Sequence, residues 1–294
     1  MPEAVRRLVR LPPTRAHVAE FLATLAVWVS VLLVAAVFLW VVGSVVVQGA
    51  PGLTWSYLVE SPADAGRAGG IGPVLVSTLL ILAVCLAVSV PLALPTAILL
   101  AEFTRAGGWF GGLVRRSLDV LAGVPSIVFG LFGNAVFSLW LGMGFSILSG
   151  GLTLACMVLP IVIRTTEEGF RSVPDDYRRA AAALSLSQSA TLWHILLPAA
   201  APGLIVGLIL GVGRALAETA ALIFTSGYVD RMPESLLDSG RALSLHIFDL
   251  SMNVPGGDAR ASSAATVLVV LLLVINMLAS GITDRWLHRR IVEA

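Results

Sequence analysis

The chain has 294 residues, of which 57% are hydrophobic and only 13% are charged, with a formal net charge of +1. This composition excludes an ordinary soluble domain and indicates a protein that crosses a membrane several times. A net charge this close to zero says nothing about partners, and we expect no nucleic acid among them.

Stretches without a charged residue set the expected number of membrane spans. There are five of them: residues 21–59, 68–101, 120–163, 195–213 and 261–283. A spanning helix needs about 20 apolar residues, so the third stretch holds two spans, with Gly142-Met143-Gly144 as the turn between them. We therefore predict an all-α polytopic membrane protein with six transmembrane helices. The predicted spans are 21–47, 73–101, 118–141, 146–165, 197–226 and 263–284.

The first span follows a basic segment that contains Arg6, Arg7, Arg10 and Arg15. A cleaved signal peptide has such a start, but its apolar core is only about 7–15 residues long. The apolar run here is longer than that, which favours a retained first span.

The placement of arginine predicts the topology. All nineteen basic residues are arginine, and fourteen of them lie in segments 1–20, 102–117, 164–194 and 284–294. Positive residues concentrate on the cytoplasmic side of a membrane, so both termini and segment 164–194 are expected in the cytoplasm of a plasma-membrane protein. The expected organisation is a segment 1–72 with the first span and an external loop, a transmembrane domain 73–284 and a cytoplasmic tail 285–294.

Several single residues in the middle spans are candidates for a role. Ser126, which follows Pro125, is a candidate polar lining residue. Arg164 follows a helix-bending Pro160; it either reaches toward lipid headgroups or contacts a transported solute. Cys85 and Cys156 lie in apolar spans and are expected to be inert core residues.

The polar segment 164–194 separates two apolar spans and is a candidate docking element. Pro174 with Asp175 and Asp176 is typical of a helix start. A helix over 177–184, a break at 185–187 and a second short helix leading to Pro198 are expected. A plain solvated loop is the alternative.

The fifth span carries two charges, Arg214 and Glu218. A charge in mid-membrane costs at least ~2.5–3.5 kcal/mol, so such residues face a partner or a pathway. Their spacing of four places them on one helix face, where they can pair. A planar guanidinium suits an oxyanion, and Thr219 adds a hydroxyl. A self-contained ion pair is the alternative, and the small residues at 203, 207, 211 and 215 predict close helix packing in either case.

The expected external loop 230–260 is polar. Leu236-Leu237 and residues 243–250 predict short amphipathic helices there, either for docking a soluble protein or as a plain surface or re-entrant helix.

Motifs for catalysis are missing from the sequence. Without lysine there is no phosphate-loop ATPase motif and no Schiff base, and the four histidines do not form a zinc motif. We therefore expect no enzyme, no metal and no bound cofactor; energy for transport would come from another subunit or an ion gradient.

Segment 171–195 resembles the coupling loop of ABC importer permeases, whose pattern is Glu-Ala-Ala, then Gly, then Ile-x-Leu-Pro. Ala180, Ala181, Ile195, Leu197 and Pro198 match it. Arg179 stands where the family has Glu, and Ser185 where it has Gly. The resemblance implies a helix seated on an ATPase subunit, with contacts from these residues and from Pro174, Asp175 and Leu186.

A narrower resemblance, to phosphate importer permeases of the PstA type, covers nearly the whole chain. It rests on the strings IGP (71–73), LAEF (100–103), VPSIVFGL (124–131), PIVIRTTE (160–167) and RALAETA (214–220). The resemblance implies a type I ABC importer permease fold, phosphate as the substrate, and alternating access driven by ATP on a separate ATPase. It also implies a second related permease subunit, an ATPase dimer and an extracytoplasmic phosphate-binding protein.

The substrate path would then include Arg214, Glu218, Thr219, Arg164 and Ser126. Three alternatives stay open: a permease of the same class for another oxyanion or small solute, an ion-coupled secondary transporter that works alone, and a membrane scaffold without transport.

Overall fold

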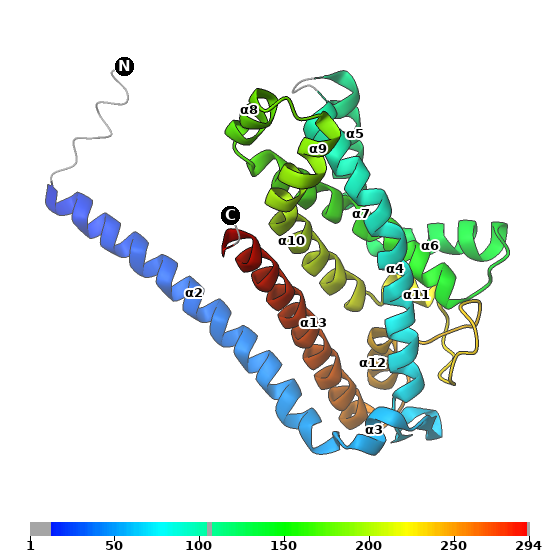
Figure 1. The fold of residues 1–294 in the computed structure, drawn as a ribbon. Helices are drawn as coiled ribbons and strands as arrows, with labels where there is room; N and C mark the ends of the chain where they lie inside the picture. The colour runs from blue at the N-terminus through cyan, green and yellow to red at the C-terminus, as the bar shows by residue number, and fades with distance from the viewer. Residues whose placement is uncertain (1–12, 105–107, 293–294) are drawn as a thin grey trace. The chain divides into compact units, whose positions relative to one another are not determined.

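The structure is a computed structural model that describes residues 13–104 and 108–292, almost entirely as helices (Figure 1). It divides into two units. The first, up to residue 48, is the long apolar helix α2 (Pro13–Gly49), and the second contains the rest of the chain. Arg6, Arg7 and Arg10, on which the predicted orientation of the N-terminus partly rests, lie outside the described residues.

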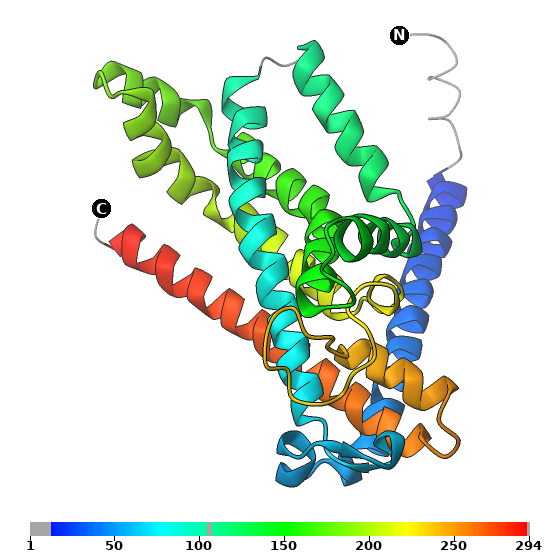
Figure 2. The same ribbon diagram turned by 90° about the vertical axis from the view of Figure 1, so that its right-hand side faces the viewer.

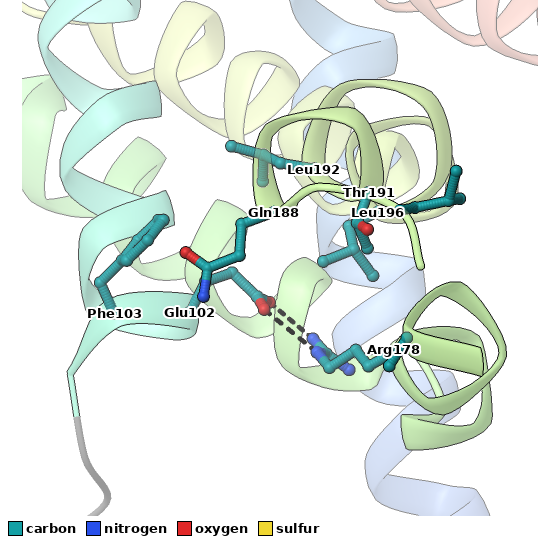
Figure 3. Close-up of a pocket in the computed structure, with 9 residues that line it drawn as sticks. Glu102, Phe103, Arg178, Gln188, Thr191, Leu192 and Leu196 are labelled. Atoms are coloured by element: carbon teal, nitrogen blue, oxygen red, sulfur yellow. Dashed lines mark hydrogen bonds and ion pairs between the residues drawn. The ribbon is translucent and has the colours of Figure 1, made fainter. Parts of the chain in front are cut away.

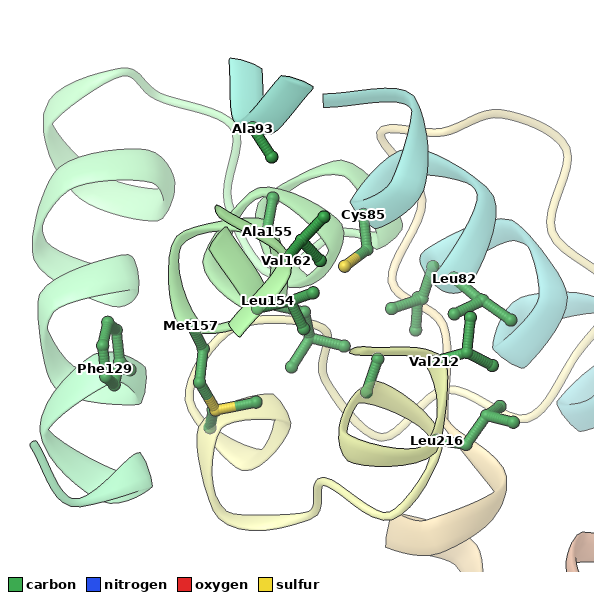
Figure 4. Packing of buried hydrophobic residues seen from close by; sticks show 14 of the residues in the cluster. Leu82, Cys85, Ala93, Phe129, Leu154, Ala155, Met157, Val162, Val212 and Leu216 are labelled. Atoms are coloured by element: carbon green, nitrogen blue, oxygen red, sulfur yellow. The ribbon is translucent and has the colours of Figure 1, made fainter. Parts of the chain in front are cut away.

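The core of the second unit is a group of three long helices. Helix α7 (Ile147–Ser172) packs between α4 (Gly72–Ile98) and α10 (Leu197–Leu216), and Figure 2 shows the same elements from the side. Leu82 and Cys85 of α4, Leu154 of α7 and Val212 of α10 belong to one buried apolar cluster (Figure 4). Cys85 and Cys156 are both free thiols.

Small residues bring α10 and α7 close together, as the spacing in the fifth span predicts. A Cβ atom added to Gly203 would lie 2.5 Å from the Gly169 Cα atom, and one added to Gly211 would lie 2.6 Å from Val158. Backbones can approach this closely only where side chains are absent.

Five helices of the described residues are long and apolar enough to cross a membrane, or six with one bent pair. That pair corrects the predicted straight span 118–141. Helix α5 (Trp109–Ala122) ends at Gly123, and α6 (Ser126–Gly133) begins after Pro125 and continues as η4 (Asn134–Trp140), bent by 99° from α5. Proline has no backbone N–H to continue the first helix, and it disfavours helical geometry in the residue before it.

Two predicted helix ends are wrong. The span predicted to end at 165 continues as α7 to Ser172, because the charges in its last turns pair inside the bundle. The span predicted over 197–226 instead ends at Leu216. There the Glu218 carboxylate accepts from the Ala221 N–H (3.3 Å) and its backbone carbonyl accepts from Ser244 Oγ (2.6 Å), so bonds to side chains replace the helical backbone hydrogen bonds. A short helix, α11 (Ala220–Ile223), follows.

The two ends of the second unit are formed by different short elements (Figure 1). The α8 end holds α8 (Asp175–Ala183), α9 (Gln188–Thr191) and η5 (Leu192–Leu196), which runs into α10. The opposite, α12 end holds α3 (Trp55–Val59), α12 (Leu243–Met252) and the first turns of α13 (Asp258–Val292). Short turns η1 (Ala50–Gly52) and η2 (Asp64–Gly66) also lie there, with a two-stranded antiparallel hairpin, β1 (Pro62–Ala63) and β2 (Ala68–Gly69), in which Pro62 pairs with Gly69.

Of the two short helices predicted in the external segment 230–260, only one forms. A helix does form over Leu243–Met252, but it is not a surface helix, because Leu243, Leu245, His246 and Leu250 are buried between α13 and α4. Leu236-Leu237 forms a turn rather than a helix.

Candidate functional site

Arg214 and Glu218 meet at the end of α10. Arg214 lies in the last helical turn, and its Nη2 atom is 3.8 Å from Glu218 Oε2. The Glu218 side chain is 6% exposed, whereas that of Arg214 is 49% exposed. The predicted pair is therefore present, but its cationic half faces away from this chain.

Thr219 and Ser126 each begin a short helix. Thr219 is the residue before α11, makes no capping bond there and is partly buried. Ser126 is the first residue of α6, directly after the bend, and is also partly buried. A cavity of about 10 Å³ beside Ser244, Ala215 and Leu216 has room for no more than a water molecule. An oxyanion next to Arg214 would therefore lie on the outside of this chain, not in that cavity.

Arg164 does not extend freely toward lipid headgroups. Its Nη2 atom donates to the Asp119 carboxylate and to the Arg115 backbone carbonyl (3.2 Å), and its Nη1 atom lies 3.5 Å from Glu167 Oε2. These contacts hold the guanidinium against the end of α5.

Arg164 and Arg214 belong to separate places along the bundle. Gly211 of α10 faces Val158 of α7, and Arg214 lies one turn further along α10. It is therefore level with about residue 155 of α7, which is about 13 Å along the helix axis from Arg164 at 1.5 Å per residue. Arg164 and Arg214 therefore lie at different levels of the bundle in this conformation.

The candidate coupling residues lie on α8 and in the turn after it. Pro174 caps α8, and Asp175 and Asp176 fill its first turn, as predicted. Most of the candidates are exposed: Pro174, Asp175, Arg179, Ala180, Ser185 and Leu186. Ala181 is buried, and Ile195, Leu197 and Pro198 are partly buried where η5 runs into α10.

Both departures from the family pattern have a visible consequence. Arg179 is 79% exposed, and its nearest carboxylate is that of Asp176, at 3.7 Å, so α8 presents a cation where the family presents an acid. Ser185 keeps the break between α8 and α9 with a φ of 52°. That left-handed geometry is the one that glycine adopts without strain.

The strongest polar contact at the α8 end involves Glu102, which the sequence did not indicate (Figure 3). Arg178 binds both oxygens of this carboxylate, Nη2 to Oε1 at 2.6 Å and Nε to Oε2 at 3.1 Å. The Glu102 hydrogen bonds raise the pKa of Arg178 above its ordinary value, so the guanidinium stays charged. The available signal was weak: an acid at the end of an apolar run looks like a boundary charge.

Glu167 was missed as well. Its side chain is only 3% exposed and accepts from Arg115 Nε (2.7 Å), while Arg171 Nη2 lies 3.0 Å away. With Arg164 this makes three arginines around one buried carboxylate. A buried charge is tolerated only when it is paired in this way.

At the α12 end, Arg241 contacts two carboxylates and one imidazole. It lies 3.2 Å from Asp249 and 3.7 Å from Asp230, and its Nη1 atom is 3.3 Å from Nδ1 of the buried His246. Burial, helped by the Arg241 charge, lowers the pKa of His246 to about 4, so the imidazole is neutral. Among residues 13–104 and 108–292, no three His, Cys, Asp or Glu residues gather as a metal would require.

A family comparison accounts for the helical arrangement. Residues 93–293 match the model of the binding-protein-dependent transport system inner membrane component. The chain belongs to this family. It is therefore a permease subunit of an ABC importer, a class that works with an ATPase and a substrate-binding protein.

Curated relatives match the permease over most of its length. It is 33% identical to "Phosphate transport system permease protein PstA" of Mycobacterium leprae, over 91% of this chain and 89% of that one. "Phosphate transport system permease protein PstA 2" of Mycobacterium bovis is 31% identical over 86% and 83% of the two chains. "Probable ABC transporter permease protein YqgI" of Bacillus subtilis is 29% identical over 94% and 97%.

Solved structures share the fold of the permease. A chain of a bacterial ABC transporter involved in the import of alginate superposes with a TM-score of 0.63 at 14% identity, over 93% of this chain and 99% of that one. A chain of the MetNI methionine ABC transporter gives 0.57 at 14% identity, over 74% and 94%. The predicted type I importer fold is confirmed.

Proposed function

We propose that this permease imports inorganic phosphate by alternating access, driven by ATP on a separate ATPase subunit. The names of relatives at 31–33% identity over more than four fifths of their length support phosphate as the cargo. Both carry the description of a phosphate transport permease.

The observation that carries the proposal is the exposure of Arg214. A half-exposed guanidinium inside a membrane-spanning segment is costly in contact with lipid. It becomes favourable when that face lines an interface with a second permease subunit through which an anion passes. Glu218 lies 3.8 Å away, beyond an ordinary hydrogen bond, and so leaves the donors of Arg214 available for phosphate oxygens.

In this proposal, phosphate passes the two arginines in sequence. The 13 Å between their levels means that each meets the anion at a different stage of the cycle. Arg164 is held by Asp119 and Glu167 in this conformation, so it would bind phosphate only after those contacts loosen. Thr219 and Ser126 would supply hydroxyl donors at helix starts near the path.

The proposed orientation places the α8 end in the cytoplasm, together with both termini, because arginine concentrates there. The ATPase dimer would then dock on α8, and a phosphate-binding protein on the α12 end. A second, related permease subunit would complete the path. This chain would bind no cofactor, and ATP would be used by the ATPase alone.

Radiolabelled phosphate uptake tests the proposal in cells that lack this gene and carry wild type, Arg214→Gln or Arg231→Gln. Arg231 is a suitable control because it is exposed in a loop and lies 3.9 Å from Glu234. We expect wild type and Arg231→Gln to restore uptake and Arg214→Gln, inserted at the same level, to fail. Equal uptake by Arg214→Gln would make Arg214 structural.

Failure of wild type would contradict the phosphate assignment. Competition by molybdate or sulfate would then point to another oxyanion. Uptake that follows only the proton or sodium gradient, in a protein purified without an ATPase, would favour a secondary transporter.

A further inference from the structure

Helix α8 is attached to the rest of the chain by very few side chains. Ala181 is its only buried residue, and alanine offers little surface for packing. Among the charged residues of α8, Arg178 is the least exposed, with 28% of its side chain exposed. Any movement of α8 that reaches the spans must therefore pass largely through Arg178 or through the chain ends.

The contacts of Arg178 are directional and complete. Besides its two bonds to Glu102, it donates to the Phe170 carbonyl at 3.0 Å, the Val173 carbonyl at 2.9 Å and the Asp175 carboxylate at 3.3 Å. A two-pronged arginine–carboxylate contact fixes orientation as well as distance. Arg178 thus joins α8 to the end of α7 and, through Glu102, to the end of α4.

The end of α4 that Arg178 contacts is π-helical. Glu102 lies in η3 (Leu99–Phe103), a π-helical extension of α4. From its other side, Arg115 of α5 donates to the Leu100 carbonyl (2.8 Å) and to Thr104 Oγ1 (3.3 Å). A π-helical turn is less regular than an α-helix and often occurs where a helix has a functional role. Two arginines from different helices therefore hold the same irregular segment.

An apolar cluster that includes Ile98, Phe170 and Leu196 joins the ends of α4, α7 and η5, but it contains no residue of α8. A cavity of about 270 Å³ lies between α8, α9 and the end of α4, lined by Phe103, Ala182, Leu186 and Leu192 among others (Figure 3). Because this space is open, side chains on its two sides cannot push on each other. The Glu102–Arg178 pair spans its edge.

We propose that the Glu102–Arg178 pair is the positioning link through which movement of α8 reaches α4, and that the Leu99–Phe103 segment is the part of α4 that shifts. This inference rests on the proposed function only in taking α8 as the place where the ATPase docks. Glu102 and Arg178 act on the transport cycle by position and do not touch phosphate.

A first test reads the movement without reference to the cargo. Phe103 is 58% exposed, so a Phe103→Cys variant of the whole transporter complex reports thiol labelling beside Glu102. We expect the labelling rate to change when the ATPase is trapped with ATP and vanadate. In Arg178→Gln the change should disappear, while in Arg116→Gln, an exposed arginine of α5, it should persist.

A second test measures phosphate imported per ATP hydrolysed for Glu102→Gln, Arg178→Gln and the double variant. Loss of a charge-assisted contact should lower this ratio about tenfold in each single variant. The double variant should be no worse, because both changes remove the same link. Glu102→Gln keeps the side-chain shape, so it remains informative even when Arg178→Gln assembles poorly.

The link is overturned when the ratio stays at the wild-type value in Glu102→Gln, or when trapping still alters labelling in Arg178→Gln. A wild-type complex whose labelling never responds to trapping also overturns it. A complex whose labelling responds as expected but which moves no phosphate supports the link and refutes only the proposed cargo.

Discussion

Gly203 of α10 lies directly against Gly169 of α7, so that a Cβ atom on Gly203 would lie 2.5 Å from the Gly169 Cα atom. The contact places two of the three central helices backbone to backbone. It also sets the register in which Arg214 and Arg164 lie at different levels of the bundle.

The first prediction concerns this contact. Gly203→Ala should lower the free energy of unfolding of the purified complex by roughly 1–3 kcal/mol, the usual cost of forcing an extra group into a packed interior. Thermal unfolding measures this change. Gly213→Ala is the matched control, since the same helix has open space there; it should be neutral or stabilising by up to about 1 kcal/mol. Equal effects of the two changes would mean that α7 and α10 are further apart than described.

Arg214→Lys gives the second prediction. Lysine keeps the charge but loses the planar pair of donors that suits an oxyanion. We expect the phosphate concentration for half-maximal uptake to rise about tenfold, as for the loss of one charge-assisted hydrogen bond. Uptake measured over a range of phosphate concentrations checks this, and an unchanged value would show that Arg214 does not bind the anion through two donors.

The sequence predicts the long helices better than it predicts contacts between residues distant in the chain. The apolar runs predicted the long helices because a span needs about 20 such residues, and the row of small residues predicted close packing of α10 but not that its partner is α7. The end of α10 at Leu216 was not predictable, because it depends on Ser244, a residue distant in the chain, bonding to the Glu218 carbonyl.

Candidate site residues show the same division. The Arg214–Glu218 pair was predicted for one continuous helix; α10 ends at Leu216, yet the two side chains still lie 3.8 Å apart. Arg178 and Glu102 are 76 residues apart, so no local sequence pattern joins them. Similarly, Arg164 resembled a residue at a helix end until the bond to Asp119 was known.

Ser185 gives the third prediction. Its φ of 52° is strained for a residue with a Cβ atom, so Ser185→Gly should stabilise the complex by about 1 kcal/mol. Ser187, whose hydroxyl accepts from the Ala190 N–H at 3.2 Å, is the contrasting site; Ser187→Ala should cost about 1 kcal/mol. Thermal unfolding of both variants measures these changes in stability. A destabilising Ser185→Gly would show that the backbone at Ser185 is not strained.

The fourth prediction is a pH dependence from His246. Its pKa is lowered to about 4 in the folded chain from about 6.5 in an unfolded one. Between these values the unfolded chain binds the extra proton, so stability falls as pH drops from 6.5 toward 4. Thermal unfolding across this range should show the loss in wild type and a shallower slope in His246→Asn. Parallel slopes would assign the loss to other groups.

We propose above that this chain forms the path of an ATP-driven phosphate importer. The most direct measurement is uptake of radiolabelled phosphate into liposomes that hold the purified complex with its ATPase and binding protein, with and without ATP on the ATPase side. We expect uptake that requires ATP and is lost in Arg214→Gln. Uptake without ATP, or no uptake of phosphate by an assembled complex that hydrolyses ATP, would contradict it.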